Sequence, residues 1–276
     1  MSTIIVCTDF SKTSRNALAY TCNFIKDKAV GQEVELLLLH IFTIPANYSG
    51  EGLSIITIND EWNDAEIQMQ EELDWVKENY PGIRIKERIK KGFLLDSLLD
   101  QIKEVQPALI VIGASGNFGD MWSWDKDILD LLRDATVPVL TVPPQVSFRT
   151  MHNIGYACNL QNVTPATPFE TIKNLVHLSN ATLHVLTVNT PQLKKIGCEQ
   201  KETLVHERLK EVAPQYHVVE ETHVVETIGH FVQQQRIDLL LVTPKRHGVW
   251  EALFRKSYTK ELMRLNSIPI MALHGK

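Results

Sequence analysis

The chain has 276 residues, which is long for one compact domain and sufficient for two domains of ordinary size. Hydrophobic residues make up 44% and charged residues 22%, a balance typical of soluble globular proteins. The formal net charge of −5 argues against nonspecific binding to nucleic acids or to anionic membranes, because both would favour a basic surplus.

The N-terminal segment and the cysteines indicate in which cellular compartment the protein is expected. The segment MSTIIVCTDF has no basic region before its short apolar run, so a signal peptide is not expected. No apolar stretch approaches the roughly 18 residues that a membrane span needs. The four cysteines, Cys7, Cys22, Cys158 and Cys198, form no CxxC pair and are predicted to be reduced and buried rather than to bind a metal. We therefore expect a cytoplasmic protein without a metal site.

The first half of the chain alternates apolar runs with segments of helical periodicity. Residues 4–7, 34–42, 109–112 and 137–142 are short runs rich in Val, Ile and Leu, typical of strands buried on both faces. Residues 13–26, 62–80 and 93–105 carry apolar side chains at helical spacing. In the second of these segments we expect the acidic residues to form the solvated face; they are Glu61, Asp64, Glu66, Glu71, Glu72 and Asp74. The alternation predicts an α/β fold with a parallel sheet covered by helices on both faces.

The second half repeats this order. Strands are expected at residues 154–158, 181–188, 216–219, 239–242 and 268–273, and helices at 168–178, 199–212, 226–235 and 250–265. The run ALIVIG at 108–113 aligns with DLLLVT at 238–243, and VPVLTV at 137–142 aligns with IPIMAL at 268–273. Because Pro143 and Pro144 interrupt the strand pattern, we place the boundary near 143–152 and expect domains at 1–144 and 152–276.

Three stretches of the first half resemble the universal stress protein family. The segment DFSKTSRNAL at 9–18 resembles its opening, LHI at 39–41 the end of its second strand, and VIGASG at 111–116 its Gly-x-x-Gly loop. The resemblance covers nearly the whole chain as two copies. It implies two tandem domains, each a Rossmann-like, five-stranded parallel sheet of the adenine nucleotide α-hydrolase-like type. It also implies an intramolecular pseudo-dimer, in which the last strands of the two domains pair with each other.

The resemblance further implies an adenine nucleotide site, for ATP or a related nucleotide, in the N-terminal domain. Asp9 would contact the adenine, Ile41 would contact it through its backbone, and Gly113 would line the ribose and phosphates. These residues follow strands whose carboxyl ends meet at one edge of a parallel sheet, which is where ligands of such folds bind.

The phosphate side of this site departs from the family pattern. Gly116 keeps the second glycine of the loop, and Asn117 follows it. Nine residues after Gly116, where ATP-binding members carry Gly-Ser or Gly-Thr, this chain has Lys126 and Asp127. The missing glycine removes close backbone approach to a phosphate, and the carboxylate repels it. We expect weak nucleotide binding or none.

The C-terminal copy departs further. Asn159 stands in place of the aspartate, TPKR at 243–246 replaces the glycine loop, and Lys256 and Ser257 replace Gly-Ser. We interpret this copy as a dimerisation and scaffold domain.

Three functions stay open at this point. The first is a non-enzymatic stress-response protein, with an unidentified protein partner and with nucleotide bound weakly in the first domain. The second is a slow ATP hydrolase or adenylyl-transfer enzyme, although no HExxH motif, nucleophile elbow or paired-carboxylate pattern indicates catalysis. The third is an interaction module whose cleft is closed by Phe118, Trp122 and Trp124.

Overall fold

The computed structural model describes residues 2–28, 33–42, 53–114, 130–132, 134–160, 163–189, 198–220, 224–244 and 267–275. In the first half, the elements are β1 (Ser2–Thr8), α1 (Lys12–Lys28), β2 (Val34–Phe42), α2 (Leu53–Asn79), β3 (Arg84–Lys91), α3 (Leu94–Val105), β4 (Leu109–Gly113) and β5 (Val139–Val142). In the second half, they are β6 (Asn153–Cys158), α5 (Phe169–Ser179), β7 (Thr182–Asn189), α6 (Cys198–Leu209), the 3-10 helix η2 (Lys210–Val212), β8 (Gln215–Glu220), α7 (Val224–Gln234), β9 (Leu239–Val242) and β10 (Ile270–Ala272).

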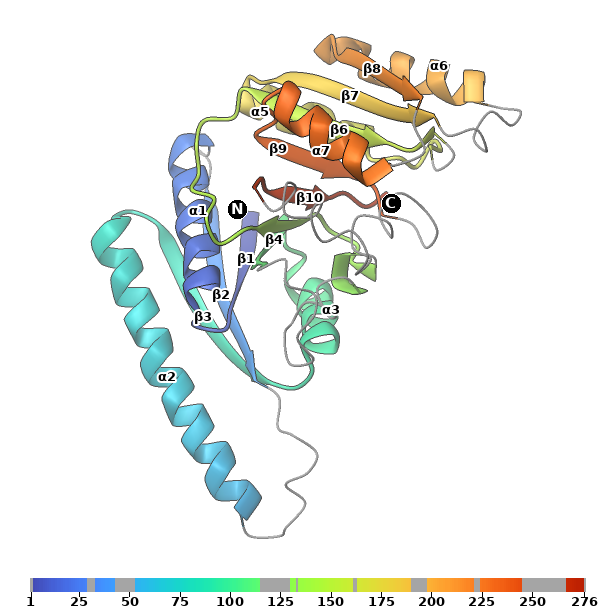
Figure 1. Ribbon diagram of the computed structural model, residues 1–276. Coiled ribbons are helices and arrows are strands. Elements are labelled where there is room, and N and C mark those ends of the chain that lie inside the picture. Colours follow the sequence, from blue (N-terminus) through green and yellow to red (C-terminus); the bar gives the residue numbers. More distant parts are fainter. Residues whose placement is uncertain are drawn as a thin grey trace.

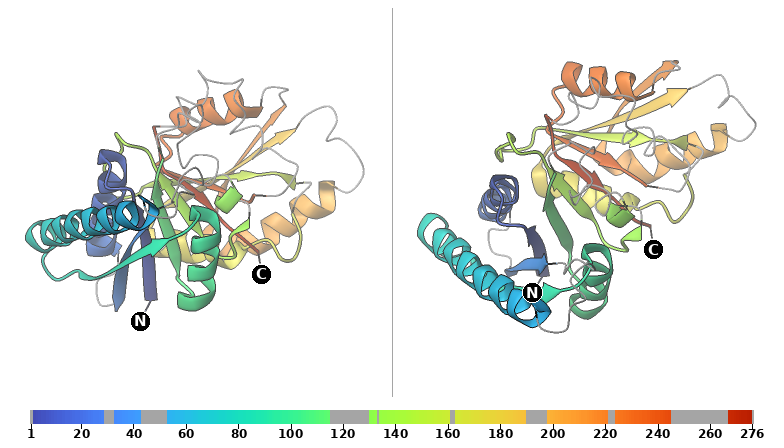
Figure 2. Two further views of the ribbon diagram at one scale, coloured as in Figure 1. Left: turned by 90° about the horizontal axis from the view of Figure 1, so that it is seen from below. Right: turned by 60° about the horizontal axis from the view of Figure 1, so that its bottom comes forward.

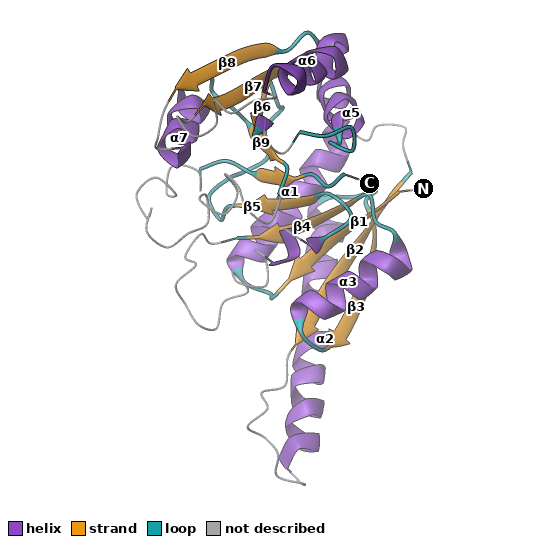
Figure 3. Cartoon of the chain, turned by 90° about the vertical axis from the view of Figure 1, so that its right-hand side faces the viewer, coloured by secondary structure: helices purple, strands orange, loops and turns teal. Residues whose placement is uncertain are grey.

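One sheet of 10 strands runs through both halves in the order β3-β2-β1-β4-β5-β10-β9-β6-β7-β8 (Figure 1). Within each half five strands are parallel and follow the same spatial order, so the predicted repeat of an α/β unit is confirmed. The halves join where β5 and β10 pair antiparallel, with Leu140 opposite Met271. The predicted pairing of the last strands is therefore confirmed, and it merges the two expected sheets into one (Figure 3). Pairing covers two apolar edges that would otherwise invite aggregation.

Strand β3 was missed by the sequence analysis, which found only four of the five strands in the first half. Its sequence, RIKERIKK, has few apolar side chains because β3 is an edge strand and pairs only with β2. Lys86 lies 2.8 Å from Glu35 of β2, so part of its cross-strand contact is ionic. The helix expected at 250–265 lies outside the described residues.

The two faces of the sheet carry separate cores. Buried residues of α1, α2, α5 and α6 belong to one core, and those of α3 and α7 belong to the other. Figure 2 shows α1 and α2 on one side of the first five strands and α3 on the opposite side. Each core continues from one half into the other, because the β5–β10 pair keeps the faces of the two sheets in register.

Helix α2 is longer than expected and carries one buried acid. Figure 1 shows that its N-terminal part extends beyond the sheet. The expectation that Glu72 lies on the solvated face was wrong, because its side chain is 1% exposed. Both of its carboxylate oxygens accept hydrogen bonds from Nε of Arg15 on α1, at 3.0 and 3.1 Å. Burial raises the pKa of Glu72, and the hydrogen bond from Arg15 opposes that rise.

The segment between the halves is held against both of them. Asn16 of α1 donates hydrogen bonds to the carbonyls of Pro143 and Val146, at 2.9 and 3.0 Å. At the other end, Asp238 accepts hydrogen bonds from the backbone N–H groups of His152 and Asn153. The short connection is thus fixed by contacts to α1 and to the start of β9.

The described cysteines agree with the expectation of reduced, buried thiols. Cys7, Cys22 and Cys158 are free and buried. Burial raises the pKa of Cys22 and of Cys158 to about 12, which keeps these thiols protonated at neutral pH. The side chain of Cys198 lies outside the described residues.

Candidate functional site

The candidate site lies at the carboxyl ends of β1, β2 and β4. These three strands are parallel neighbours, with β1 in the middle. The chain passes from β1 to β2 on one side and later returns to β4 on the other side. The strand order therefore reverses between β1 and β4, where ligands of open α/β sheets bind. The structure brings together the residues that follow these strands, including Asp9 and Gly113.

Serine side chains organise the start of α1 beside this edge. Ser11 is the N-cap residue, and its Oγ accepts a hydrogen bond from the N–H of Ser14 at 3.2 Å. Ser14 is buried, and its hydroxyl lies 3.2 Å from Oγ1 of Thr8, at the end of β1. The Ser-x-x-Ser motif thus has a structural role, because it caps the helix and ties it to β1.

Asp9 places a carboxylate at the mouth of the site. Its side chain is exposed, and Oδ1 accepts a hydrogen bond from the backbone N–H of Ser11 at 3.0 Å. This local turn orients the carboxylate at the end of β1, where it can accept further hydrogen bonds from a ligand.

A row of aromatic rings lies beside Asp9, and the sequence analysis did not select it. The rings of Phe10 and His40 are 4.3 Å apart, and those of His40 and Phe42 are 6.3 Å apart and nearly parallel. The ring of Trp62 on α2 meets Phe42 edge-on at 5.8 Å. Positions 40 and 42 share a face of β2 because side chains alternate along a strand, which is the one signal that could have predicted the row.

The backbone of Phe10 has a φ of 60°, a conformation that is unusual for a bulky residue. Its N–H donates a hydrogen bond to Oγ1 of Thr8 at 3.0 Å, which holds this turn. Such outliers occur often at functional sites.

His40 is fixed as a neutral ring. Its Nδ1 donates a hydrogen bond to the carbonyl of Thr8 at 2.8 Å. Burial lowers the pKa of His40, whereas the hydrogen bond and the charge of Asp9 act in the opposite direction. A neutral ring with Nδ1 protonated leaves Nε2 as an acceptor.

Ile41 presents its backbone to the site and its side chain to the core. The side chain is 4% exposed. The carbonyl of Phe42 accepts a hydrogen bond from Gly92 at 3.0 Å, so the backbone of Phe42 faces β3. Because successive residues of a parallel strand face alternate neighbours, Ile41 faces the β1 side. The β1–β2 pairing ends at Thr8 and His40, so Ile41 lies just beyond it.

Gly113 is required for the packing of β4 against α1, which was not predicted from the sequence. A Cβ atom at this position would lie 2.6 Å from the carbonyl oxygen of Thr13, in the first turn of α1. Only glycine allows β4 to approach the helix this closely. The N–H of the next residue, Ala114, donates to the carbonyl of Val142 at 3.1 Å. The predicted residues Gly116, Asn117, Lys126 and Asp127 lie outside the described residues, as do Phe118, Trp122 and Trp124.

The matching edge of the second half has different chemistry. Cys158 ends β6 where Thr8 ends β1, and Asn159 follows it in place of Asp9. Cys158 is 4% exposed, and its raised pKa leaves a neutral thiol there. This edge therefore lacks the carboxylate of the first half. Residues 245 and 246 of the TPKR segment, together with Lys256 and Ser257, lie outside the described residues.

Neither a membrane-spanning helix nor a metal-binding cluster is found within the described residues. No described helix is both long and apolar enough to cross a membrane. Within the same residues, no group of three or more His, Cys, Asp or Glu side chains could hold a metal ion.

The ten-stranded tandem sheet and the site at the β1–β4 crossover define a Rossmann-like α/β protein. Its sequence matches the Universal stress protein family over residues 1–143, and the chain belongs to this family. A comparison with curated proteins gives no match.

Solved structures share the fold. A universal stress protein from Archaeoglobus fulgidus DSM 4304 is 14% identical and aligns over 100% of this chain and 97% of its own, with a TM-score of 0.70. A functionally unknown protein from Pseudomonas aeruginosa PAO1 is 16% identical, over 100% of this chain and 93% of its own, with a TM-score of 0.56. These likenesses show that the chain has the tandem universal stress protein fold.

Proposed function

We propose that this chain is a cytoplasmic, non-enzymatic stress-response protein whose N-terminal domain binds an adenine nucleotide weakly. In this proposal residues 1–144 and 152–276 are the two domains, and the C-terminal domain completes an internal dimer through β5 and β10. The observation that carries the proposal is the exposed carboxylate of Asp9 beside the aromatic row, at the crossover between β1 and β4.

The chemistry of this edge suits the adenine base. The carboxylate of Asp9 can accept hydrogen bonds from the amino group of adenine, and the backbone of Ile41 faces the same side of β2. The rings of Phe10 and His40, tilted by 31° to each other, offer aromatic surface on which a purine can stack. Recognition of the base would therefore rest on described residues at the carboxyl ends of β1 and β2.

Recognition of the phosphates would be weak. The N–H of Ala114 already donates to Val142, so this donor is not free for a phosphate oxygen. Further along the loop, Lys126 and Asp127 stand where ATP-binding members carry Gly-Ser or Gly-Thr. We therefore expect the triphosphate to add little affinity to that of the nucleoside.

Titration calorimetry with adenosine and with Mg·ATP tests both parts of the proposal. We expect one site per chain and dissociation constants for the two ligands that agree within about threefold. Adenosine at ten times its dissociation constant should then raise the free energy of unfolding by about 1.4 kcal/mol. Incubation of the protein with Mg·ATP should release no ADP above the buffer control.

A matched pair of variants locates the site. Asp9→Ala should weaken adenosine at least tenfold, because it removes charge-assisted hydrogen bonds worth roughly 1.5–3 kcal/mol. Asn159→Ala, at the equivalent position of the second half, should leave the affinity unchanged. Absence of saturable adenosine binding, or equal affinity in both variants, would refute the proposed site. Steady release of ADP that Asp9→Ala abolishes would refute the non-enzymatic assignment.

A further inference from the structure

An apolar slot lies between the two halves, away from the candidate nucleotide site. It has a volume of about 300 Å³ and runs between α1 and α5. Phe24 and Ile25 of α1 line one wall, Leu175 and Leu178 of α5 line the other, and Met271 of β10 contributes between them. Leu178 is 38% exposed, so this wall of the slot reaches the surface. The walls come from both halves of the chain, so the slot exists only because β5 and β10 pair.

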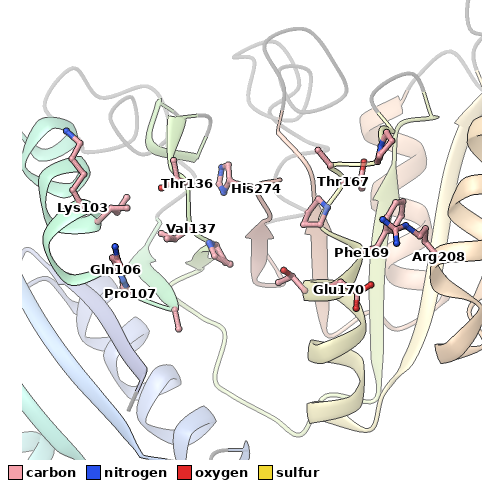
Figure 4. Close-up of a pocket in the computed structure, with 17 residues that line it drawn as sticks. Lys103, Gln106, Pro107, Thr136, Val137, Thr167, Phe169, Glu170, Arg208 and His274 are labelled. Atoms are coloured by element: carbon pink, nitrogen blue, oxygen red, sulfur yellow. The ribbon is translucent and has the colours of Figure 1, made fainter. Parts of the chain in front are cut away.

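A wider cavity continues from this slot. Its volume is about 990 Å³, and three of its lining residues, Ala108, Pro138 and Thr171, also line the slot. Figure 4 shows it as a groove with α3 on one side and the start of α5 on the other. The two cavities therefore adjoin each other; the narrow one is almost wholly apolar, and the wide one also carries polar and charged side chains.

Two cationic side chains line the wide end. Lys103 and Arg208 lie on opposite walls of the groove (Figure 4). Lys103 is paired only weakly, with exposed Asp100 at 3.3 Å, and Arg208 forms no ion pair within the described part of the chain. The carboxylate of Glu170 is partly neutralised by Lys173 at 3.0 Å. Among the charged side chains that line the groove, two are therefore cationic and one is anionic.

Two further groups favour an anion at the wide end. Helix α5 begins there without a side-chain cap. The N–H of Phe169 donates to the carbonyl of Thr167 at 2.7 Å, so the N–H groups of Glu170 and Thr171 are the ones that can donate to a ligand. His274 lines the same groove, and its Nε2 donates to the carbonyl of Leu132 at 2.8 Å. Its ring is kept neutral, because burial lowers its pKa. His274 thus anchors the wall rather than adding charge.

We propose that the slot and the groove together bind an amphipathic carboxylate of the fatty-acid class. The alkyl chain lies between α1 and α5, and the carboxylate lies near Arg208 and the first turn of α5. Apolar side chains on both walls exclude a charged or strongly hydrated group from the slot. A carboxylate is a good match for the planar guanidinium of Arg208. This site is independent of the proposed nucleotide site, and a ligand in it would bridge the two halves.

Titration calorimetry of the full chain with dodecanoate, below its micelle concentration, tests the proposal. We expect one dodecanoate per chain. Dodecanol should bind at least tenfold more weakly, because it lacks the charge that Arg208 recognises. Hexanoate should also bind at least tenfold more weakly, because it buries less apolar surface.

Two pairs of variants assign the ends of the ligand. Leu178→Asp places a charge in the slot and should abolish binding, whereas Ile67→Asp, at an apolar residue of α2 that is 60% exposed, should not alter it. Arg208→Gln should weaken dodecanoate about tenfold but leave dodecanol unchanged. Arg84→Gln, on the edge strand β3, is the control for loss of one positive charge. All four positions are exposed, so thermal melting can verify that the variants fold.

Three results would overturn this assignment. The first is the absence of saturable dodecanoate binding, and the second is equal loss of affinity in Leu178→Asp and Ile67→Asp. The third is equal affinity for dodecanoate and dodecanol, which would leave the charged end without a role.

Discussion

The two halves of the sheet share one backbone pattern and fill it differently. In the first half Ile5 of β1 pairs with Leu37 of β2, and in the second half Gly155 of β6 pairs with His184 of β7. The positions are equivalent, because Ile5 also pairs with Ile110 of β4 just as Gly155 pairs with Leu240 of β9. One half thus has two aliphatic side chains where the other has a glycine and an imidazole.

The contact between the edge strand and the helix that covers it also differs between the halves. In the first half Arg88 of β3 donates hydrogen bonds to Gln101 and Glu104 of α3. The residue equivalent to Arg88 is His217 of β8, and its ring lies 5.3 Å from that of Phe231 on α7. A polar contact between strand and helix in one half is replaced by an aromatic contact in the other.

Gly155 makes room for this aromatic contact. A Cβ atom at Gly155 would lie 3.1 Å from Cε1 of Phe231, and also 3.1 Å from Cγ2 of Ile237. Phe231 stands where α3 has Gln101, so a larger helix side chain is matched by a smaller strand residue. The comparison teaches that the same space between sheet and helix is filled by different combinations of side chains.

Phe231→Ala should disrupt the packing of α7 against Gly155 of β6 most strongly. Phe231 is 5% exposed, and its removal should lower the free energy of unfolding by about 3 to 5 kcal/mol, because a cavity remains above Gly155. Urea unfolding followed by circular dichroism measures the loss. Gly155→Val alone should cost about 1 to 3 kcal/mol through overpacking.

The double variant Phe231→Ala/Gly155→Val tests the exchange of volume directly. The valine fills part of the cavity, so the double variant should be less destabilised than the sum of the single variants, by at least about 1 kcal/mol. Strict additivity would show that Gly155 and Phe231 are not matched in this way.

The helices that cover the other face give a second comparison. Glu72 on α2 is 1% exposed and bound to Arg15, whereas Glu211 is 60% exposed and bound to Lys173. Arg15→Ala should cost about 3 kcal/mol at neutral pH, because it leaves a buried carboxylate without its partner. Lys173→Ala should cost less than about 1 kcal/mol, because the carboxylate of Glu211 is exposed and stays solvated without its partner.

The pH dependence of the Arg15→Ala variant follows from the raised pKa of Glu72. Without Arg15 the pKa rises further, so the folded variant retains a proton that the unfolded chain releases. The deficit of the variant should therefore grow as the pH rises above about 4.5, the ordinary pKa, and shrink below it. Chemical unfolding at pH 5 and pH 8 checks this, and a deficit independent of pH would contradict the assignment of a buried carboxylate.

The sequence predicted those elements whose apolar pattern is strong, and it failed where tertiary contacts decide. Strands such as β2 were predicted because they are buried on both faces, but β3 was missed because an edge strand can be charged. Glu72 was misplaced because an acidic side chain on a helix gives no sign of a buried partner on another helix.

The candidate site was predicted in the same uneven way. Asp9 was found because it directly follows an apolar strand. The ring contact between Phe10 and His40 was missed, since it depends on the register of two strands and on an unusual φ at Phe10. Gly113 was predicted to line a ligand site. Its close approach to α1 depends on how the helix packs on β4, which the sequence does not show.

The smallest effect that we expect concerns His184 and His217. Nδ1 of His184 lies 3.1 Å from Nε2 of His217, and Nε2 of His184 lies 3.2 Å from Oδ1 of Asn153. An amide oxygen accepts, so His184 carries its proton on Nε2 and accepts at Nδ1 from His217. A proton added to His184 must go to Nδ1, where it would face the N–H of His217. Both rings of the pair are therefore neutral. The equivalent residues of the first half, Leu37 and Arg88, cannot form such a pair.

Acid should weaken the fold through this pair. Burial lowers the pKa of both rings below the ordinary value of 6.5, and for His184 the charge of His217 adds to this effect. Between the lowered values and 6.5 the unfolded chain binds more protons than the folded chain, so the free energy of unfolding falls as the pH is lowered from 7 to 5.

The double variant His184→Leu/His217→Leu should make this decrease smaller. Leucine is the residue that the first half has at the position of His184. Part of the decrease remains in the double variant, because burial lowers the pKa of His40 and His274 there as it does in the unmodified protein. His152→Ala, at an exposed histidine, is the control. An unchanged pH slope in the double variant would mean that the pair titrates in the folded chain as it does in the unfolded one.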